Sequence, residues 1–102
     1  MELIQTYSKA IHALCATYQV RSLFAFGSVT RNELKPESDI DLVVDIDTLD
    51  PLAYSDNYFN LKFHLEHILK RNIDLLEMKA IKNPILKQNI DNSKILVYGK
   101  GY

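Results

Sequence analysis

Residues 39–46 constrain the fold most strongly, because they place acidic side chains within an apolar strand. The run Ile-Asp-Leu-Val-Val-Asp-Ile over residues 40–46 is typical of a buried strand. Successive strand side chains point to opposite faces, so Asp39 and Asp41 share one face while Ile40 and Leu42 point into the core. Two neighbouring carboxylates repel each other unless a cation lies between them or one is protonated. The segment therefore predicts a cation site, and carboxylate oxygens on a rigid strand suit magnesium.

Apolar spacing predicts alternating helices and strands around this segment. We expect helices over residues 4–18, 28–34, 51–71 and 84–90, and strands over 22–26, 40–46, 73–78 and 94–98. Asp50-Pro51 marks the start of the long helix, and residues 91–93 are expected to end the last one. This order predicts the α/β class, in an α+β arrangement with a small mixed β-sheet and helices packed on it.

The length of 102 residues predicts a single domain over residues 1–102 with one hydrophobic core. A domain of this size leaves much of its surface uncovered, so a partner protein or a homo-oligomer is expected. Twelve basic and thirteen acidic residues without a basic run argue against stable nucleic-acid binding by this chain alone. No leader segment or apolar stretch of about 20 residues is present, so we expect a cytoplasmic protein without membrane association.

A third carboxylate, Asp74, repeats the local pattern in Ile73-Asp74-Leu75-Leu76, with one acid flanked by apolar residues. If its strand lies beside residues 40–46, Asp74 faces the same site as Asp39 and Asp41. Three carboxylates on adjacent strands suit a two-metal phosphoryl-transfer site, whose ions lie about 3.5–4 Å apart. Asp45 and Asp47 lie an even number of residues from Asp39 and Asp41, so along a strand they would point to the same face. They approach a loop, however, and are expected to be solvated.

Gly27-Ser28 follows the first predicted strand and supplies a candidate phosphate site. Glycine at a strand end lets the backbone come close to a phosphate, and a following helix start offers free N–H groups. The Ser28 hydroxyl can donate to a phosphate oxygen. Arg31 lies one turn further on, where it either contacts the same phosphates or is an ordinary solvated side chain.

Gly27-Ser28, ten intervening residues and Asp39-Ile40-Asp41-Leu42 together resemble the signature of the polymerase-β-like nucleotidyltransferase superfamily. The resemblance is closest to its minimal prokaryotic members, short domains often paired with a helical HEPN-domain protein as a toxin–antitoxin system. By this resemblance, Gly27 and Ser28 match the phosphate-binding pair and Asp39 and Asp41 the metal-binding pair. Asp74 matches the third acid, often assigned as the general base. Asn32 departs from the pattern, since many relatives carry glycine there.

The resemblance implies a polymerase-β-like fold and a magnesium-dependent nucleotidyltransferase with two Mg²⁺ ions and ATP as substrate. Its metal-binding and catalytic residues would be Asp39, Asp41 and Asp74, and its nucleotide-binding residues Gly27 and Ser28, to which the position of Arg31 one turn further on adds a candidate. AMP would be transferred to a hydroxyl acceptor, in the first place on a HEPN-type partner, as an antitoxin of this group does to a tyrosine. The alternatives are an antitoxin that captures its partner sterically without catalysis, or transfer to a small molecule or RNA.

An apolar patch of Leu52, Phe59 and Phe63 lies on the side of the long helix opposite its core-facing stripe. Either a neighbouring helix covers these side chains, or they form a surface for a partner or a second copy. The spacing alone leaves both interpretations open.

Overall fold

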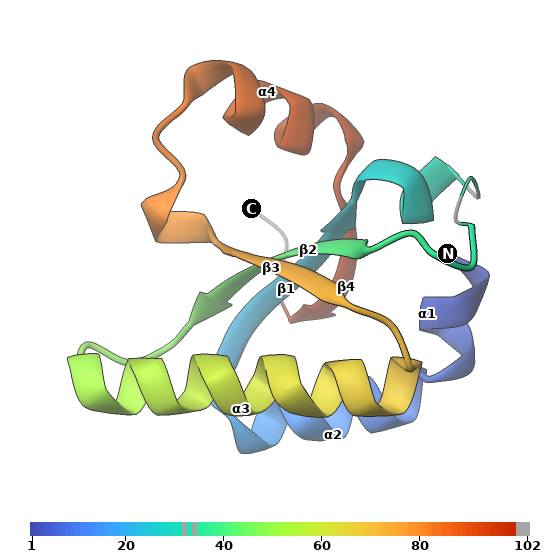
Figure 1. The fold of residues 1–102 in the computed structure, drawn as a ribbon. Coiled ribbons are helices and arrows are strands. Elements are labelled where there is room, and N and C mark those ends of the chain that lie inside the picture. Colours follow the sequence, from blue (N-terminus) through green and yellow to red (C-terminus); the bar gives the residue numbers. More distant parts are fainter. Residues whose placement is uncertain (32, 34, 100–102) are drawn as a thin grey trace.

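The computed structural model describes residues 1–31, 33 and 35–99, and its helices and strands build a sheet covered on both faces (Figure 1). The helices are α1 (Glu2–Thr6), α2 (Ser8–Thr17), α3 (Pro51–Leu69) and α4 (Pro84–Ser93), with 3-10 helices η1 (Gly27–Arg31) and η2 (Met78–Ala80). The strands are β1 (Val20–Phe26), β2 (Ile40–Ile46), β3 (Ile73–Glu77) and β4 (Ile95–Gly99). The α+β class with a small mixed sheet is confirmed.

The sheet has the order β3-β2-β1-β4. β1 pairs antiparallel with β2 and with β4, whereas β2 and β3 run parallel. The long helix α3 connects the two parallel strands, as a parallel pair requires a crossover connection. β3 therefore lies beside β2, as the placement of Asp74 required.

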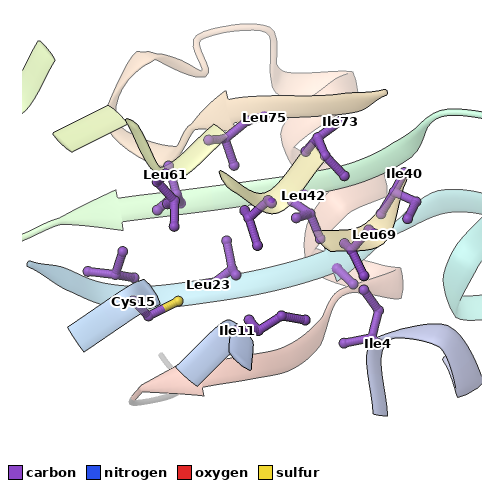
Figure 2. Packing of buried hydrophobic residues seen from close by; sticks show 14 of the residues in the cluster. Ile4, Ile11, Cys15, Leu23, Ile40, Leu42, Leu61, Leu69, Ile73 and Leu75 are labelled. Atoms are coloured by element: carbon purple, nitrogen blue, oxygen red, sulfur yellow. The ribbon is translucent and has the colours of Figure 1, made fainter. Parts of the chain in front are cut away.

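One face of the sheet packs on α1, α2 and α3 and holds the main core. Figure 2 shows Ile11 and Cys15 of α2 and Leu61 and Leu69 of α3 directed toward strand residues, among them Leu42. The alternate residues Ile40, Leu42, Val44 and Ile46 of β2 are all fully buried in this core. The spacing of Leu61, Leu65 and Leu69 explains why α3 lies flat on the sheet, since residues three and four apart share a helix face.

The opposite face of the sheet is covered in part by α4 (Figure 1). Phe24, Val43 and Ile90 form a second, smaller apolar cluster there. A cavity of about 300 Å³ lies between α4, η2 and Val43. Asp41 is two residues from Val43 on the same strand, so its side chain points to this less covered face.

Among the α-helices, the first and the last differ most in extent from those expected, and the long helix ends at Leu69 instead of residue 71. The first helix is interrupted at Tyr7, which separates α1 from α2 and is itself exposed. Residues 91–93 do not end α4, which runs to Ser93. Polar side chains there bond within the helix instead of breaking it: the Ser93 hydroxyl donates to the Asn89 carbonyl, and Lys94 pairs with Asp91.

Strand β4 forms one edge of the sheet, and its pairing with β1 is irregular. The register shifts between Leu23 and Phe24, so that Leu23 lies opposite Tyr98 and Phe24 opposite Leu96. Val97 is the extra residue of this bulge. Its carbonyl oxygen lies 2.9 Å from Nε2 of His12 on α2. None of the helices within the described residues is both long and apolar enough to cross a membrane.

Candidate active site

The turn after β1 is shaped by contact between Gly27 and Asp41. Gly27 has a φ of 73°, in the left-handed region that favours glycine. A Cβ atom at this position would lie 2.5 Å from Oδ2 of Asp41. Because real carbon and oxygen atoms do not approach so closely, the carboxylate of Asp41 occupies the space that any other residue at position 27 would need.

The segment after Gly27 is a short 3-10 helix rather than the longer helix expected over residues 28–34. The Thr30 hydroxyl donates to the Gly27 carbonyl at 2.7 Å and closes the turn. Asn32 and Leu34 lie outside the described residues. The structure therefore does not test the departure at position 32, where this chain has asparagine and many relatives have glycine. The role of Gly27 and Ser28 in holding phosphate stays a prediction. With only a short 3-10 helix after Gly27, phosphate binding would rely on the backbone of this turn and not on the dipole of a long helix.

Asp41 is near the beginning of β2, the strand between β1 and β3. It is opposite Phe26 in the antiparallel pair with β1 and opposite Asp74 in the parallel pair with β3. Asp41 and Asp74 therefore point to the same face of the sheet, as do the apolar residues Val43 and Leu76 that follow them. The structure thus brings Gly27, Asp41 and Asp74 together from three separate segments.

The electrostatics of Asp41 reflect this crowding of negative charge. Burial raises the pKa of the Asp41 carboxyl above its ordinary value of 3.8, and the charges of Asp74 and Asp39 raise it further. A side-chain hydrogen bond with Asp74 acts in the same direction, while the positive charge of Arg31 opposes it. The site thus concentrates carboxylate oxygens where a bound cation would relieve their repulsion.

Asp39 lies just before β2 and is exposed. It is two residues from Asp41, and in an extended backbone residues two apart point to the same face. Across residues 1–31, 33 and 35–99, no three histidine, cysteine, aspartate or glutamate side chains are grouped closely enough to hold one metal ion. The donor set itself, oxygen ligands on adjacent strands, is the type that magnesium prefers. The assignment of metal ions to Asp39, Asp41 and Asp74 stays a prediction.

Arg31 ends η1 and is exposed, and its Nε lies 3.3 Å from Oε2 of the exposed Glu33. Its charge acts on Asp41, as the pKa of that carboxyl shows. A surface pair of this kind contributes little energy and is readily exchanged for another anion. Contact between Arg31 and a phosphate stays a prediction.

The expectation that Asp45 is solvated is wrong. Asp45 is 3% exposed, and its carboxylate lies 3.9 Å from Nη1 of Arg21 and 3.5 Å from Nζ of Lys79. Two cations from β1 and η2 compensate its charge, and neither is adjacent to it in the chain. Asp47, by contrast, is an exposed acid that pairs with Arg21.

Arg71 is a residue near the site that the spacing of the sequence did not indicate. It lies between α3 and β3, and its guanidinium donates to backbone carbonyls of the turn that leads into Asp39. Nothing in the local sequence signals such a contact, because its partners are more than thirty residues away.

The comparison with protein families decides how this site is understood. The family model described as polymerase beta, nucleotidyltransferase, matches residues 9–101. The chain belongs to this family. It is a nucleotidyltransferase, and the match spans Gly27, the carboxylates and the segment through β4.

Two relatives carry names that describe a reaction. A proposed protein adenylyltransferase of Methanocaldococcus jannaschii is 40% identical over 80 residues, which cover 78% of this chain and 79% of that protein. The protein adenylyltransferase MntA of Thermococcus cleftensis is 33% identical over 70 residues, covering 69% of this chain and 68% of the relative.

Solved structures share the fold. A structure described as a proposed minimal nucleotidyltransferase has a TM-score of 0.75 at 28% identity and covers 92% of each chain. A chain of a toxin–antitoxin complex with AMP-PNP has a TM-score of 0.71 at 24% identity, covering 91% of this chain and 73% of its own. A chain of the complex between a tri-AMPylated Shewanella oneidensis HEPN toxin and its MNT antitoxin has a TM-score of 0.65 at 23% identity, covering 95% and 73%.

Proposed function

We propose that this protein is a magnesium-dependent protein adenylyltransferase that moves AMP from ATP to a hydroxyl group of a HEPN-type toxin. The observation that supports this proposal most directly is the meeting of Gly27, Asp41 and Asp74 at one point of the sheet. The names of the relatives and the nature of the two toxin–antitoxin complexes support the choice of nucleotide and acceptor.

In the proposed reaction, the acceptor oxygen forms a bond to the α-phosphorus of ATP, and the bond from that phosphorus to pyrophosphate breaks. The turn at Gly27-Ser28 holds the phosphates, with Arg31 as a further contact. Asp39, Asp41 and Asp74 would hold two Mg²⁺ ions, which supply charge stabilisation for the attacking and leaving oxygens. Asp74 accepts the proton of the acceptor hydroxyl. Residues 1–102 act as one domain, and a location in the cytoplasm stays a prediction.

Substitution of Asp39 by asparagine is expected to abolish transfer of labelled AMP to the partner, because a neutral amide binds Mg²⁺ poorly. The measurement incubates the protein with magnesium, α-labelled ATP and a HEPN-type partner protein, and follows the label on the partner. The matched control is Asp47→Asn, which removes another exposed carboxylate, just beyond the far end of β2, and should keep activity. If the Asp39→Asn variant labels the partner as strongly as the wild type, the proposal is contradicted.

The apolar patch favours protein capture as a second component of the function. Leu52, Phe59 and Phe63 are 78%, 63% and 65% exposed, and no described element of the chain covers them. The interpretation that a neighbouring helix covers them is therefore wrong for the described residues. Large apolar side chains exposed on one helix of a small domain are typical of an interface. We assign it to the partner protein.

The double substitution Phe59→Ser and Phe63→Ser is expected to abolish the complex with the partner without lowering the thermal midpoint, since both rings are exposed. Light scattering after size-exclusion chromatography measures the complex and the protein alone. The matched control is Ile85→Ser on α4, which removes an equally exposed apolar side chain from another face. A change from dimer to monomer in the protein alone would instead assign the patch to a second copy. Unfolding without any change in association would rule out an interface.

A further inference from the structure

Arg71 contacts the turn before β2 through a set of hydrogen bonds that the proposed chemistry does not use. Its Nη1 donates to the carbonyl oxygens of Lys35 at 2.6 Å, Pro36 at 3.3 Å and Ser38 at 3.4 Å. Hydrogen bonds from a charged donor are about twice as strong as neutral ones. The half-buried Arg71 side chain therefore binds several carbonyl groups of the turn that leads into Asp39.

The turn also has bonds of its own, which leave its position in space open. The Ser38 N–H donates to the Lys35 carbonyl at 3.0 Å, and the Lys35 N–H donates to the Ser38 hydroxyl at 3.2 Å. These bonds fix the shape of the turn, because they join residues within it. Its placement relative to the sheet depends on contacts with other segments, and Arg71 supplies them from the α3–β3 connection.

The residue after Arg71 contacts the other side of Asp39. The Ile40 N–H donates to the Asn72 carbonyl at 3.1 Å, which begins the pairing of β2 with β3. Asp39 is thus flanked by Ser38, bound through its carbonyl to Arg71, and by Ile40, bound through its N–H to Asn72. Two consecutive residues hold the backbone on both sides of one carboxylate.

The α3–β3 connection is itself firmly attached to α3. Lys70 adopts the left-handed conformation that ends the helix, and its N–H donates to the Glu66 carbonyl. The Glu66 carboxylate in turn accepts a hydrogen bond from the Ile73 N–H at 3.0 Å. Asp74 follows directly. The connection that places Asp74 therefore also carries the Arg71 side chain.

We propose that Arg71 is a positioning residue for Asp39, which holds the turn at residues 35–38 so that Asp39 faces the same site as Asp41 and Asp74. The inference rests on the proposed function, in which Asp39 binds metal. The hydrogen bonds of Arg71 go to backbone carbonyls of the turn, so its role is to act through the turn and Asp39. Lysine at this position would keep the charge but offers a compact, more strongly hydrated donor in place of the guanidinium, so it should restore the arrangement only in part.

The test compares Arg71→Gln and Arg71→Lys with a control that removes a neighbouring charge. Lys70→Asn is that control: Lys70 lines the same surface groove as Arg71 and Asp39, and asparagine tolerates its left-handed conformation. The first readout is Mn²⁺ binding to the complex of protein with a non-hydrolysable ATP analogue, followed by electron paramagnetic resonance. Arg71→Gln should weaken binding roughly tenfold, as loss of a group that orients a metal ligand does. Arg71→Lys should fall between, and Lys70→Asn should match the wild type.

The second readout needs no ligand and follows hydrogen exchange of the Ile40 amide, which donates to Asn72. Exchange should be faster in Arg71→Gln and unchanged in Lys70→Asn. In the transfer reaction, kcat should fall and KM for magnesium-bound ATP should rise in line with the weaker metal binding, while Lys70→Asn should leave both unchanged. Equal losses in Lys70→Asn and Arg71→Gln, or wild-type Mn²⁺ binding by Arg71→Gln, would overturn the inference.

The two readouts also separate this inference from the proposed function. A wild-type protein that binds no Mn²⁺ with the nucleotide analogue would contradict the proposed function itself. In that case the exchange of the Ile40 amide still decides whether Arg71 holds the turn, and unchanged exchange in Arg71→Gln rejects that role as well.

Discussion

Asp41→Asn should raise the thermal stability of the unliganded protein and strongly lower nucleotidyl transfer in the same variant. Asp41 lies opposite Asp74 and against Gly27, where burial and the charges of Asp74 and Asp39 disfavour its ionised form. Asparagine removes this unfavourable charge, so the thermal midpoint should rise by about 2–4 °C at pH 7. Transfer should fall by two to three orders of magnitude, as loss of a group that stabilises transition-state charge does.

The stability gain should depend on pH in a direction that follows from the raised pKa of Asp41. The folded protein binds this proton more tightly than the unfolded chain, whose carboxyl titrates near its ordinary value of 3.8. The wild-type protein therefore loses stability as the pH rises from that value through the raised pKa. Below it, Asp41 is protonated in both states, and the advantage of asparagine should vanish.

Thermal unfolding from about pH 3 to about pH 8, which spans the ordinary titration of carboxyl groups and extends well above it, gives the measurement for Asp41→Asn. Asp47→Asn serves as the control, because Asp47 is exposed and paired with Arg21, so its removal should give no gain. Addition of Mg²⁺ and a nucleotide analogue should stabilise the wild type more than the variant. A variant that is less stable than the wild type at neutral pH would contradict the electrostatic account.

Gly27→Ala is expected to damage both stability and activity, for two separable reasons. The positive φ of 73° costs alanine about 1–2 kcal/mol of unfolding free energy. In addition, the new methyl group would lie 2.5 Å from Oδ2 of Asp41, so the carboxylate must move. A catalytic group displaced by about 1 Å can lower the rate a hundredfold, and transfer should fall by that order.

A double-mutant cycle with Asp41→Ala separates the two effects of Gly27→Ala. Without the Asp41 carboxylate the methyl group meets no oxygen, so only the backbone cost should remain. The coupling free energy from chemical denaturation should therefore be at least about 0.5 kcal/mol. Additive losses would show that the contact between Gly27 and Asp41 has no energetic weight.

The strands near the site could be predicted because their signals are local. The run from Ile40 to Ile46 has the length and apolar character of a strand, and its acidic residues lie an even number of positions apart. It is observed with the expected bounds. The same reasoning predicted a strand around Asp74, which is observed as β3. That this strand lies beside β2 was a condition of the expected site, and the register of the two strands meets it. The strands themselves depend on residues within a few positions of one another, so a single sequence contains them, whereas their pairing does not.

The remaining features depend on partners that are distant in the chain. Asp45 is buried because Arg21 and Lys79 approach it from other elements, which no local spacing reveals. Arg71 binds carbonyl groups in the turn at residues 35–38, and any residue has such groups. The break at Tyr7 is not visible in the sequence, because the apolar spacing continues through it.

The irregular edge at β4 has a consequence for how this protein behaves at high concentration. The segment Ile95–Gly99 is apolar, and a regular edge of this composition can template strands of other molecules and begin aggregation. The bulge at Val97 bends the strand away from flat pairing, and His12 engages the carbonyl of that residue. One extra residue and one imidazole ring thus protect an apolar edge of the sheet, at the end of the strand order away from β3 and Asp74.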